Sequence, residues 1–303
     1  MTHNQGSITC IVMLRLLTPQ DRPVIDEFLE RHRASSVFLR ANLFESGLED
    51  GPEPFQGLYM GAFAGGVLTD VAAHYRNGRI VLQAPTRPVE LALAVARESG
   101  RPVNGLLGPW FQVRAAEPQL DLDRTRLGKV VPEYLYRLDL AALAVPEPLS
   151  SGRVKFRRAR VADLKTLVAW RREYDLHTMG FSAHSIDDAA IRDGLAGMIE
   201  ANRLWVLEEA GCPVSMTGFI AALPDTVQVG GVFTPKEFRG RGHGRSVVAG
   251  SLLEARAEGV AEAILFTETD NHPAQRAYEA LGFKRIGDYG MVMLDPVRGK
   301  VGG

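Results

Sequence analysis

This 303-residue sequence has little cysteine, no marked excess of charge of one sign and no long apolar run. Only Cys10 and Cys212 are present. Two cysteines cannot build a disulfide framework, so nothing in the sequence calls for an oxidising compartment. The 35 Lys and Arg residues nearly balance 36 Asp and Glu residues, which leaves a formal net charge of −1. Because proteins that grip nucleic acid or an anionic membrane need a basic excess, we expect neither partner.

The lack of long apolar runs excludes a membrane-spanning helix, because no stretch approaches the roughly 18 residues that such a helix needs. The apolar run 8–17 is interrupted by Arg15. It has no preceding basic segment and no following small-residue cleavage site, so it predicts a first β-strand rather than a targeting signal. We therefore expect a cytoplasmic protein.

The length suggests two domains, at about 100–200 residues each. The segment 144–152 is rich in Pro, Ser and Gly, which is typical of a linker and of neither a helix nor a central strand. It separates residues 1–143 from residues 153–303. Each half begins with a short strand and a helix and ends with an apolar strand near Leu-Asp, which suggests a duplicated unit.

Hydrophobic periodicity predicts a mixture of strands and helices in both halves, and hence an α/β (or α+β) fold. The expected strands are 57–64 and 67–75, joined as a hairpin, then 79–84, 103–107, 134–140, 154–157, 203–209, 214–222, 226–233, 263–267 and 289–294. The expected helices are 21–33, 88–99, 163–173 and 245–258.

A glycine-rich turn, Arg239-Gly-Arg-Gly-His-Gly244, follows the expected strand 226–233 and precedes the expected helix 245–258. Such a turn presents unpaired N–H groups and the positive end of the helix dipole, which favours a phosphate or pyrophosphate ligand. Its spacing matches neither a P-loop nor the dinucleotide fingerprint. Taken alone, the segment can equally be a flexible basic loop.

A second pattern, Asn271-His-Pro-Ala-Gln-Arg-Ala-Tyr-Glu-Ala-Leu-Gly-Phe283, lies about 30 residues downstream. Asp270 or Asn271 can cap a helix that Gly282 ends, and Asn271, Ala274 and Tyr278 fall on one face of it. Taken alone, this is typical of a core helix with one buried tyrosine.

Together, strand, Arg-x-x-Gly-x-Gly, helix, strand and Asn-x-x-Ala-x-x-x-Tyr-x-x-x-Gly-Phe resemble the GNAT superfamily of acyl-CoA-dependent N-acetyltransferases over about residues 153–295. The first half carries neither motif, and the joined halves resemble tandem GNAT proteins. The resemblance implies a degenerate GNAT-like domain over 1–143 and a catalytic GNAT domain over 153–303. Each would be a mixed, mostly antiparallel twisted sheet flanked by helices.

The resemblance also implies an acetyl-CoA site in the second half. In the family, the strand before the glycine loop splays from its neighbour and bonds the pantetheine arm through its main chain. By this likeness Val232, Phe233 and Thr234 contact the arm and thioester, and Asn271 contacts the pantetheine. The pyrophosphate contacts are Arg239, Gly240, Arg241, Gly242, His243, Gly244, Arg245 and Ser246. No metal is expected, because His243 has no second His or Cys within a few residues.

The implied reaction is direct attack of a neutral amine on the thioester, with Tyr278 as the general acid. A tyrosine, with an ordinary pKa near 10, stays protonated at neutral pH and can donate its proton to the leaving thiolate. The general base stays open. Several family members carry a glutamate early in the strand 226–233, where Thr226 and Gln228 stand here. Asp225 and Glu268 are candidates, although each is also typical of a solvated loop carboxylate.

Other notable residues have plain structural interpretations. The aromatic residues Trp110, Phe111 and Trp170 are expected in core or interdomain packing, and Cys212 has no histidine partner that would make it a nucleophile. A basic run is expected to form a solvated face, with an acidic substrate or the adenosine 3′-phosphate as the alternative ligand. The run comprises Arg153, Lys155, Arg157, Arg158 and Arg160.

The sequence thus predicts an N-acetyltransferase that takes its acyl group from acetyl-CoA and passes it to an unidentified amine, as a monomer or homodimer. The alternative is a non-catalytic acyl-CoA-binding sensor or scaffold. A third interpretation, nucleic-acid binding through the arginines of the glycine-rich turn, conflicts with the neutral net charge.

Overall fold

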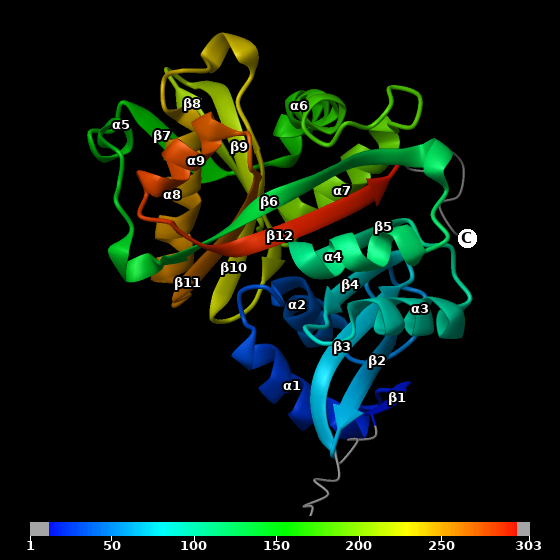
Figure 1. Cartoon of the computed structure of the whole chain (residues 1–303). Coiled ribbons are helices and arrows are strands. Elements are labelled where there is room, and N and C mark those ends of the chain that lie inside the picture. The colour runs from blue at the N-terminus through cyan, green and yellow to red at the C-terminus, as the bar shows by residue number, and fades with distance from the viewer. Residues whose placement is uncertain (1–11, 296–303) are drawn as a thin grey trace, which may run out of the picture. The chain divides into compact units, whose positions relative to one another are not determined.

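The computed structural model describes residues 12–295, which divide by their internal contacts into two compact units (Figure 1). Unit 1 comprises residues 12–108 and 112–121, and unit 2 comprises residues 109–111 and 122–295. Each described helix is too short or too polar to cross a lipid bilayer. The expected first strand is β1, and residues 8–11 of that expectation lie outside the described residues.

Unit 1 is built around a sheet with the strand order β1-β2-β3-β4-β5. Neighbouring strands are antiparallel except for β4 and β5, which are parallel and connected by α3. The strands are β1 Val12–Leu16, β2 Gly57–Ala64, β3 Val67–Tyr75, β4 Arg79–Gln83 and β5 Gly105–Pro109. The helices are α1 Arg22–Arg31, α2 Val37–Ser46, α3 Pro88–Ser99 and α4 Trp110–Ala116, with 3₁₀ turns at Pro19–Asp21 and Glu117–Gln119.

The β2–β3 hairpin has the predicted bounds, and its turn explains why it forms. Gly65 and Gly66 have φ angles of +57° and +84°. A two-residue hairpin loop with two positive φ angles matches the right-handed twist of the strands, and glycine adopts such angles without steric cost.

Unit 2 is built around a sheet with the strand order β12-β6-β11-β10-β9-β8-β7. It is antiparallel except for the parallel pair β10 and β11, which α8 connects. The strands are β6 Leu127–Asp139, β7 Val154–Arg158, β8 Leu204–Glu209, β9 Cys212–Ala222, β10 Thr226–Phe233, β11 Glu262–Glu268 and β12 Lys284–Leu294. The helices are α5 Glu147–Ser150, α6 Leu164–His177, α7 Asp188–Glu200, α8 His243–Ala257 and α9 His272–Glu279. Short 3₁₀ turns occur at Arg124–Arg126, Leu140–Ala142, Val161–Asp163 and Lys236–Phe238. The predicted class of mixed, mostly antiparallel sheets flanked by helices is confirmed.

Strand β6 precedes the expected linker in the sequence but belongs to the sheet of unit 2. It pairs antiparallel with β11 on one side and with β12 on the other, and Figure 1 shows β6 running beside β12. The division by contacts therefore differs from the expected boundary at residue 144. The expectation that 144–152 contains no helix is wrong, because α5 lies there. Its proline at the second helical position is tolerated, since a first-turn N–H has no intrahelical partner.

Helices cover both faces of the unit 2 sheet, and each face has its own apolar cluster. On one face, α8 and α9 pack through Val248, Leu252 and Tyr278 against strand residues such as Val229 and Leu265. On the other face, α6 and α7 bury a second cluster. Its members include Leu167, Trp170, Leu195, Val206, Met216 and Phe233.

Of the aromatic residues that were expected to pack in the core or between domains, one is buried and another is exposed. Trp170 is buried in the α6 cluster, as expected. The expectation for Phe111 is wrong, because 57% of this residue is exposed. It is the second residue of the short helix α4, whose buried side chains are Gln112, Val113 and Ala116.

Candidate functional site

Strands β10 and β11 separate part-way along their length. Their parallel pairing joins Thr226–Val229 to Glu262–Leu265, and among the described residues it ends there although both strands continue. Beyond this point β10 is also irregular, with a register shift against β9 between Gly230 and Phe233 and a φ angle of +60° at Gly231. The bulge bends β10 away from β11 and leaves main-chain donors and acceptors available to a ligand. The splay implied by the family resemblance is therefore present.

Of the three residues expected to contact a pantetheine arm, Val232 and Phe233 end β10 and point to opposite faces, and Thr234 directly follows the strand. Phe233 is buried on the α6 face, 6.2 Å from the Trp170 ring between centroids, whereas Val232 packs on the α8 face. Ser215 of β9 contacts the chain at the end of β10. Its hydroxyl donates to the carbonyl of Phe233 at 2.9 Å and lies 2.9 Å from the Thr234 hydroxyl.

The glycine-rich turn leads directly into α8, which begins at His243, two residues earlier than predicted. Gly240 and Gly242 have φ angles of +78° and +77°, where other residues are strained. Gly242 is the N-cap, and the N–H of Ser246 donates to its carbonyl at 2.9 Å. The first N–H groups of an α-helix have no intrahelical partner. The amides at the start of this 15-residue helix are therefore available to an anion.

Gly244 brings the helix start close to the end of β10. A Cβ atom at this position would lie 3.5 Å from the Thr234 hydroxyl oxygen and 3.7 Å from Cγ1 of Val232. A larger side chain would fill the space between the two elements. The loop and the strand that the sequence assigned to one ligand are thus neighbours in space.

Buried polar atoms without partners gather at the first turn of α8. In the described part of the chain, Nδ1 of His243, Nε of Arg245 and Oγ of Ser246 are buried and make no hydrogen bond. Leaving such atoms unsatisfied costs about 1–3 kcal/mol each, so this turn fits a polar ligand. The donor set, which adds free helix amides, suits the pyrophosphate of an acyl-CoA.

The other two arginines of the turn are held differently. Arg239 donates from Nε to the carbonyl of Thr234 at 2.9 Å, and its guanidinium lies 5.9 Å from the centre of the Phe233 ring. Arg241 is largely exposed, with Nη1 3.7 Å from a carboxylate oxygen of Glu209. Arg239 therefore braces the turn, while Arg241 can reach a ligand without breaking a close pair.

Tyr278 lies on α9, and of the two expected caps, Asp270 and Asn271, it is Asn271 that caps this helix. The Asn271 side-chain oxygen accepts from the N–H of Ala274 at 3.2 Å, so this oxygen fixes the helix start. Tyr278 is only 9% exposed and packs edge-on against Phe283, with ring centroids 6.0 Å apart. Within residues 12–295 its hydroxyl has no hydrogen-bond partner. A buried phenol of this kind is held in place by packing and has a proton to donate.

Burial raises the pKa of Tyr278 above its ordinary value, and the nearby Tyr174 and Glu133 raise it further. Tyr174 of α6 behaves similarly, since burial raises its pKa to about 12. Both phenols are therefore protonated at neutral pH. The two tyrosines belong to helices on opposite faces of the sheet.

Sequence reasoning missed the residues that α6 and β6 add to this region. The guanidinium of Arg171 lies 5.2 Å from the centre of the Tyr174 ring and donates to Asp175 at 2.8 Å. A Cβ atom at Gly231 would lie 3.9 Å from Nη1 of Arg171, which places this arginine beside the bulge of β10. In the sequence Arg171 lay within the expected helix 163–173, and Tyr174 lay just beyond its end. Glu133 fell outside the half that carries the motifs.

The two carboxylates named as candidate bases differ in position. Asp225 precedes β10 at the end away from the splay, so it lies about 26 Å from Phe233 at roughly 3.3 Å per residue. This distance removes it as a base for chemistry in the splay. Glu268 ends β11 at the splayed end and remains a candidate by position.

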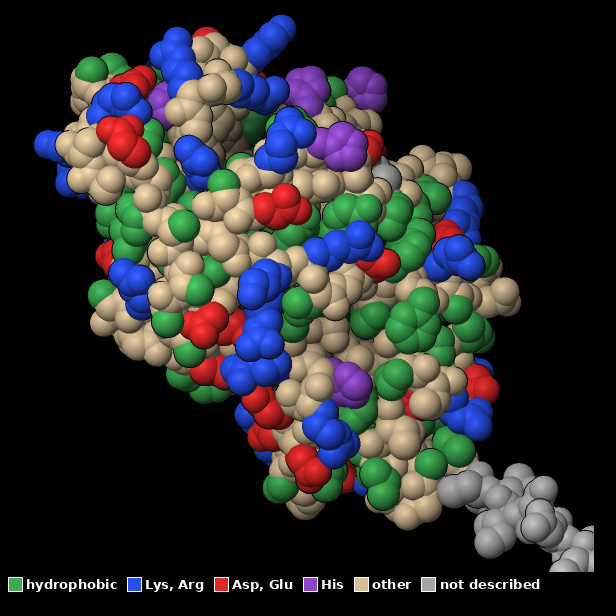
Figure 2. Space-filling model, turned by 60° about the vertical axis from the view of Figure 1, so that its left-hand side comes forward, with side chains coloured by type: hydrophobic (Ala, Val, Ile, Leu, Met, Phe, Trp, Pro, Cys, Tyr) green, Lys and Arg blue, Asp and Glu red, His purple; other side chains and the backbone are tan. Residues whose placement is uncertain are grey.

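The basic run at the start of the second half is largely neutralised by ion pairs. Arg157 pairs with Asp163 and Glu208, and Arg158 pairs with Glu254. These pairs favour the expected solvated face over an anion site. Figure 2 shows basic and acidic side chains interspersed on the face that it draws, which gives nucleic acid no continuous basic surface there.

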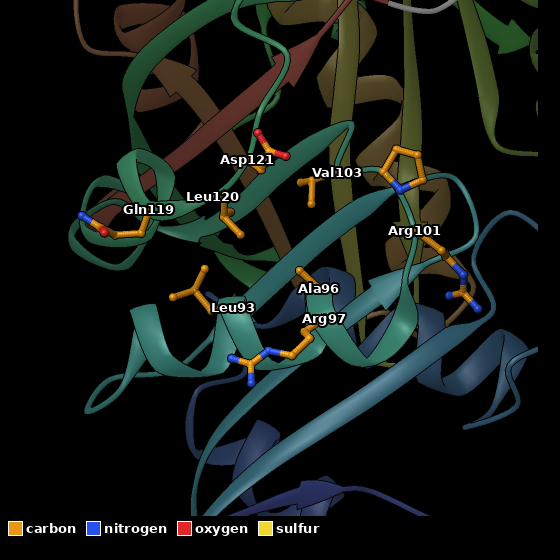
Figure 3. Close-up of a pocket in the computed structure, with 9 residues that line it drawn as sticks. Leu93, Ala96, Arg97, Arg101, Val103, Gln119, Leu120 and Asp121 are labelled. Atoms are coloured by element: carbon orange, nitrogen blue, oxygen red, sulfur yellow. The ribbon is translucent and has the colours of Figure 1, made fainter.

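A cavity of about 370 Å³ lies in unit 1, away from both motifs (Figure 3). Leu93, Ala96 and Leu120 converge on it, whereas the guanidinium group of Arg97 points away in Figure 3. Arg101 donates to the carbonyl of His74 at 3.0 Å and also pairs with Asp50. The lining therefore offers no convergent polar groups, and the candidate site stays in unit 2.

Comparison with known proteins agrees with this location. Residues 167–283 match the family model of the acetyltransferase (GNAT) family. No curated protein matches the chain in sequence.

Solved structures match over most of the chain. A GNAT-family acetyltransferase from Colwellia psychrerythraea is 16% identical with a TM-score of 0.52, over 93% of this chain and 99% of that one. A tandem GNAT protein from the clavulanic acid biosynthesis pathway is 12% identical with a TM-score of 0.52, over 93% and 98%. A GCN5-related N-acetyltransferase from Kribbella flavida is 15% identical with a TM-score of 0.55, over 88% and 95%. The TM-scores show that the chain shares the fold of these proteins, and residues 167–283 are the part that also matches the family model.

Proposed function

We propose that the protein is an N-acetyltransferase that binds acetyl-CoA in unit 2 and transfers the acetyl group to a primary amine. The observation that carries this proposal is that unit 2 contains three features together. They are the free helix start after the glycine-rich turn, the splay between β10 and β11, and the largely buried Tyr278. In this order, the three features would bind the pyrophosphate and the pantetheine arm of acetyl-CoA and protonate the thiolate that leaves the thioester.

The turn and the strand would hold the two ends of the ligand. The free amides at the start of α8, with the partnerless groups of His243, Arg245 and Ser246, would take the pyrophosphate. The main chain of Val232 and Phe233 would bond the pantetheine arm, because β11 no longer pairs with it. Main-chain bonds of this kind extend a sheet edge and require no particular side chain.

Tyr278 would supply the proton for the thiolate that leaves. Acetyl-CoA brings to the site a thioester carbonyl that is open to attack by a neutral amine. A main-chain N–H near Val232 or Phe233 would stabilise the negative charge on the carbonyl oxygen, an effect of about 3 kcal/mol. A thiol has an ordinary pKa near 8.5, well below that of the buried Tyr278 phenol, so Tyr278 stays protonated until the thiolate needs its proton.

A non-catalytic acyl-CoA sensor needs the helix start and the splay but has no use for Tyr278. In the described part of the chain the hydroxyl of Tyr278 bonds nothing, so the fold gains no hydrogen bond from it. A phenylalanine would pack equally well there. The presence of this unbonded hydroxyl therefore favours the enzyme over the sensor.

The direct test is a thiol-release assay with purified full-length protein, acetyl-CoA and a panel of amines. The proposal predicts release that depends on the amine and saturates with acetyl-CoA. Binding of acetyl-CoA without release by any amine supports the sensor, and absence of binding contradicts both functions.

A further inference from the structure

Gln228 of β10 places a buried amide beside the bulge of that strand. Its neighbours Val227 and Val229 pack in the α8 cluster, so the alternation of a strand directs Gln228 to the opposite face, which carries α6 and α7. Its Nε2 donates to the carbonyl of Val229 at 2.7 Å, and a Cβ atom at Gly230 would lie 3.6 Å from the same nitrogen. The amide therefore lies against the start of the bulge.

The oxygen of this amide is a hydrogen-bond acceptor without a donor. Gln228 is 4% exposed, and its Oε1 is buried and makes no hydrogen bond within residues 12–295. Leaving a buried acceptor unsatisfied is costly, whereas an N–H group of a ligand would satisfy it. The main chain next to it is accessible, because Gly230 and Gly231 are half-buried. A ligand that carries an N–H group therefore fits here.

Arg171 of α6 brings the opposite kind of group to the same bulge. A Cβ atom at Gly231 would lie 3.9 Å from its Nη1, so the guanidinium lies next to the residue that follows Gly230. In the described part of the chain only Nε of Arg171 is used, and it donates to Asp175 at 2.8 Å. The side chain is partly exposed, so the donors on both Nη atoms can reach a ligand. A planar guanidinium suits a carboxylate, which it can bind with two parallel hydrogen bonds.

We infer that Gln228 and Arg171 form the acceptor subsite, and that the acceptor is a primary amine that carries a carboxylate. This inference rests on the proposed function. Oε1 of Gln228 accepts a hydrogen bond from the amine, and Arg171 binds the carboxylate. A carboxylate on the acyl group is the other source of this chemistry. An acyl group has no N–H to offer Gln228, so the two side chains together fit the amine better.

The subsite lies on the face of the sheet opposite to Tyr278. Gln228 and Arg171 face the side of α6, whereas Tyr278 packs in the cluster on the side of α8 and α9. A thioester in the gap where β10 leaves β11 would lie between the two faces. The amine would then reach its carbonyl carbon from one face, while Tyr278 protonates the sulfur from the other.

The first test compares amines that differ only in the carboxylate. A series of ω-amino acids, beginning with glycine, and the alkylamines of the same length cover the range of separations between the two groups. With acetyl-CoA, at least one amino acid should have a kcat/KM about tenfold or more above that of its alkylamine, the value of a hydrogen bond to a charged group. Arg171→Gln should remove most of this preference. Arg172→Gln, which removes the neighbouring charge of α6, should keep it.

Gln228 is tested by two variants that both lose the hydrogen bond to the Val229 carbonyl. Gln228→Leu also loses the acceptor oxygen, whereas Gln228→Glu keeps one. Gln228→Leu should raise the KM for the amine about tenfold or more, and Gln228→Glu should recover most of that loss. The affinity for acetyl-CoA, measured by calorimetry, should be the same in both variants. An equal rise of the amine KM in the two variants would overturn the role of Oε1.

The source of the carboxylate is tested separately. Equal kcat/KM values for the amino acids and the alkylamines would overturn the assignment of Arg171. A preference for succinyl-CoA over acetyl-CoA that Arg171→Gln removes would also overturn it, because the carboxylate would then belong to the acyl group.

Calorimetric titration of the CoA-bound protein with the same amines measures binding without turnover. If no amine releases thiol but the amino acids bind and Arg171→Gln abolishes this binding, the proposed function fails and the subsite stands. Equal binding of amino acids and alkylamines would overturn the subsite, whatever the turnover.

Discussion

Replacing Tyr278 by phenylalanine should separate catalysis from stability. The substitution removes one hydroxyl that has no hydrogen-bond partner among the described residues and leaves the ring contact with Phe283 in place. A hydroxyl that makes no hydrogen bond within the protein contributes none to its stability. The free energy of unfolding should therefore change little. Activity should fall.

The same substitution removes the proton that the leaving thiolate needs. General-acid catalysis contributes about 100-fold to 10,000-fold, so kcat should fall at least tenfold, which corresponds to about 1.4 kcal/mol in the barrier. Affinity for acetyl-CoA should change little. Thiol release measures kcat, and urea unfolding measures stability.

Tyr136→Phe is the matched control. Its hydroxyl donates to Glu279 at 3.0 Å, so its removal should cost about 1 kcal/mol of stability and leave kcat unchanged. The two variants thus predict opposite patterns. Wild-type kcat in Tyr278→Phe would refute the general-acid assignment, and a clear loss of stability would refute the claim that the hydroxyl is unbonded.

The remaining predictions concern the glycine-rich turn and a buried histidine. Gly244→Val should weaken acetyl-CoA binding at least tenfold without lowering Tm, because its methyl groups would fill the space beside Thr234 and Val232. Calorimetric titration and thermal melting measure the two effects, and wild-type affinity would contradict the assigned site. His74 of β3 is fully buried, and burial lowers its pKa to about 4. Since the unfolded chain takes the proton more readily, stability should be complete above pH 6.5. It should fall by up to about 3 kcal/mol as the pH drops toward 4. Urea unfolding across this pH range measures the loss of stability. His74→Gln should abolish the part of the loss that comes from protonation of this histidine.

The sequence was most informative where a feature is local. The β2–β3 hairpin, the glycine-rich turn and the α9 cap each depend on residues within one short segment, and all three have the predicted form. Helix α2 was missed because its apolar residues lie on most sides of the helix, so no stripe with a 3.6-residue period stands out. Such a helix can be recognised from its tertiary packing but not from the periodicity of its sequence.

Strand β6 shows why the rest could not be predicted. The sequence indicated a strand only from residue 134, but β6 begins at Leu127 and passes through Pro132. Proline argues against a central strand because it lacks an N–H group. Here the pairing with β11 ends at Glu133, so Pro132 lies just beyond that ladder. Glu133 lies opposite Glu268 because β6 pairs between β11 and β12, a long-range pairing that no local pattern encodes.

The central claim is that the start of α8 binds the diphosphate of an acyl-CoA. Isothermal titration of the full-length protein with acetyl-CoA tests this claim most directly. The account predicts heat that saturates at one acetyl-CoA per chain and is lost when Gly244 is replaced by valine. A flat titration of the wild-type protein would contradict it.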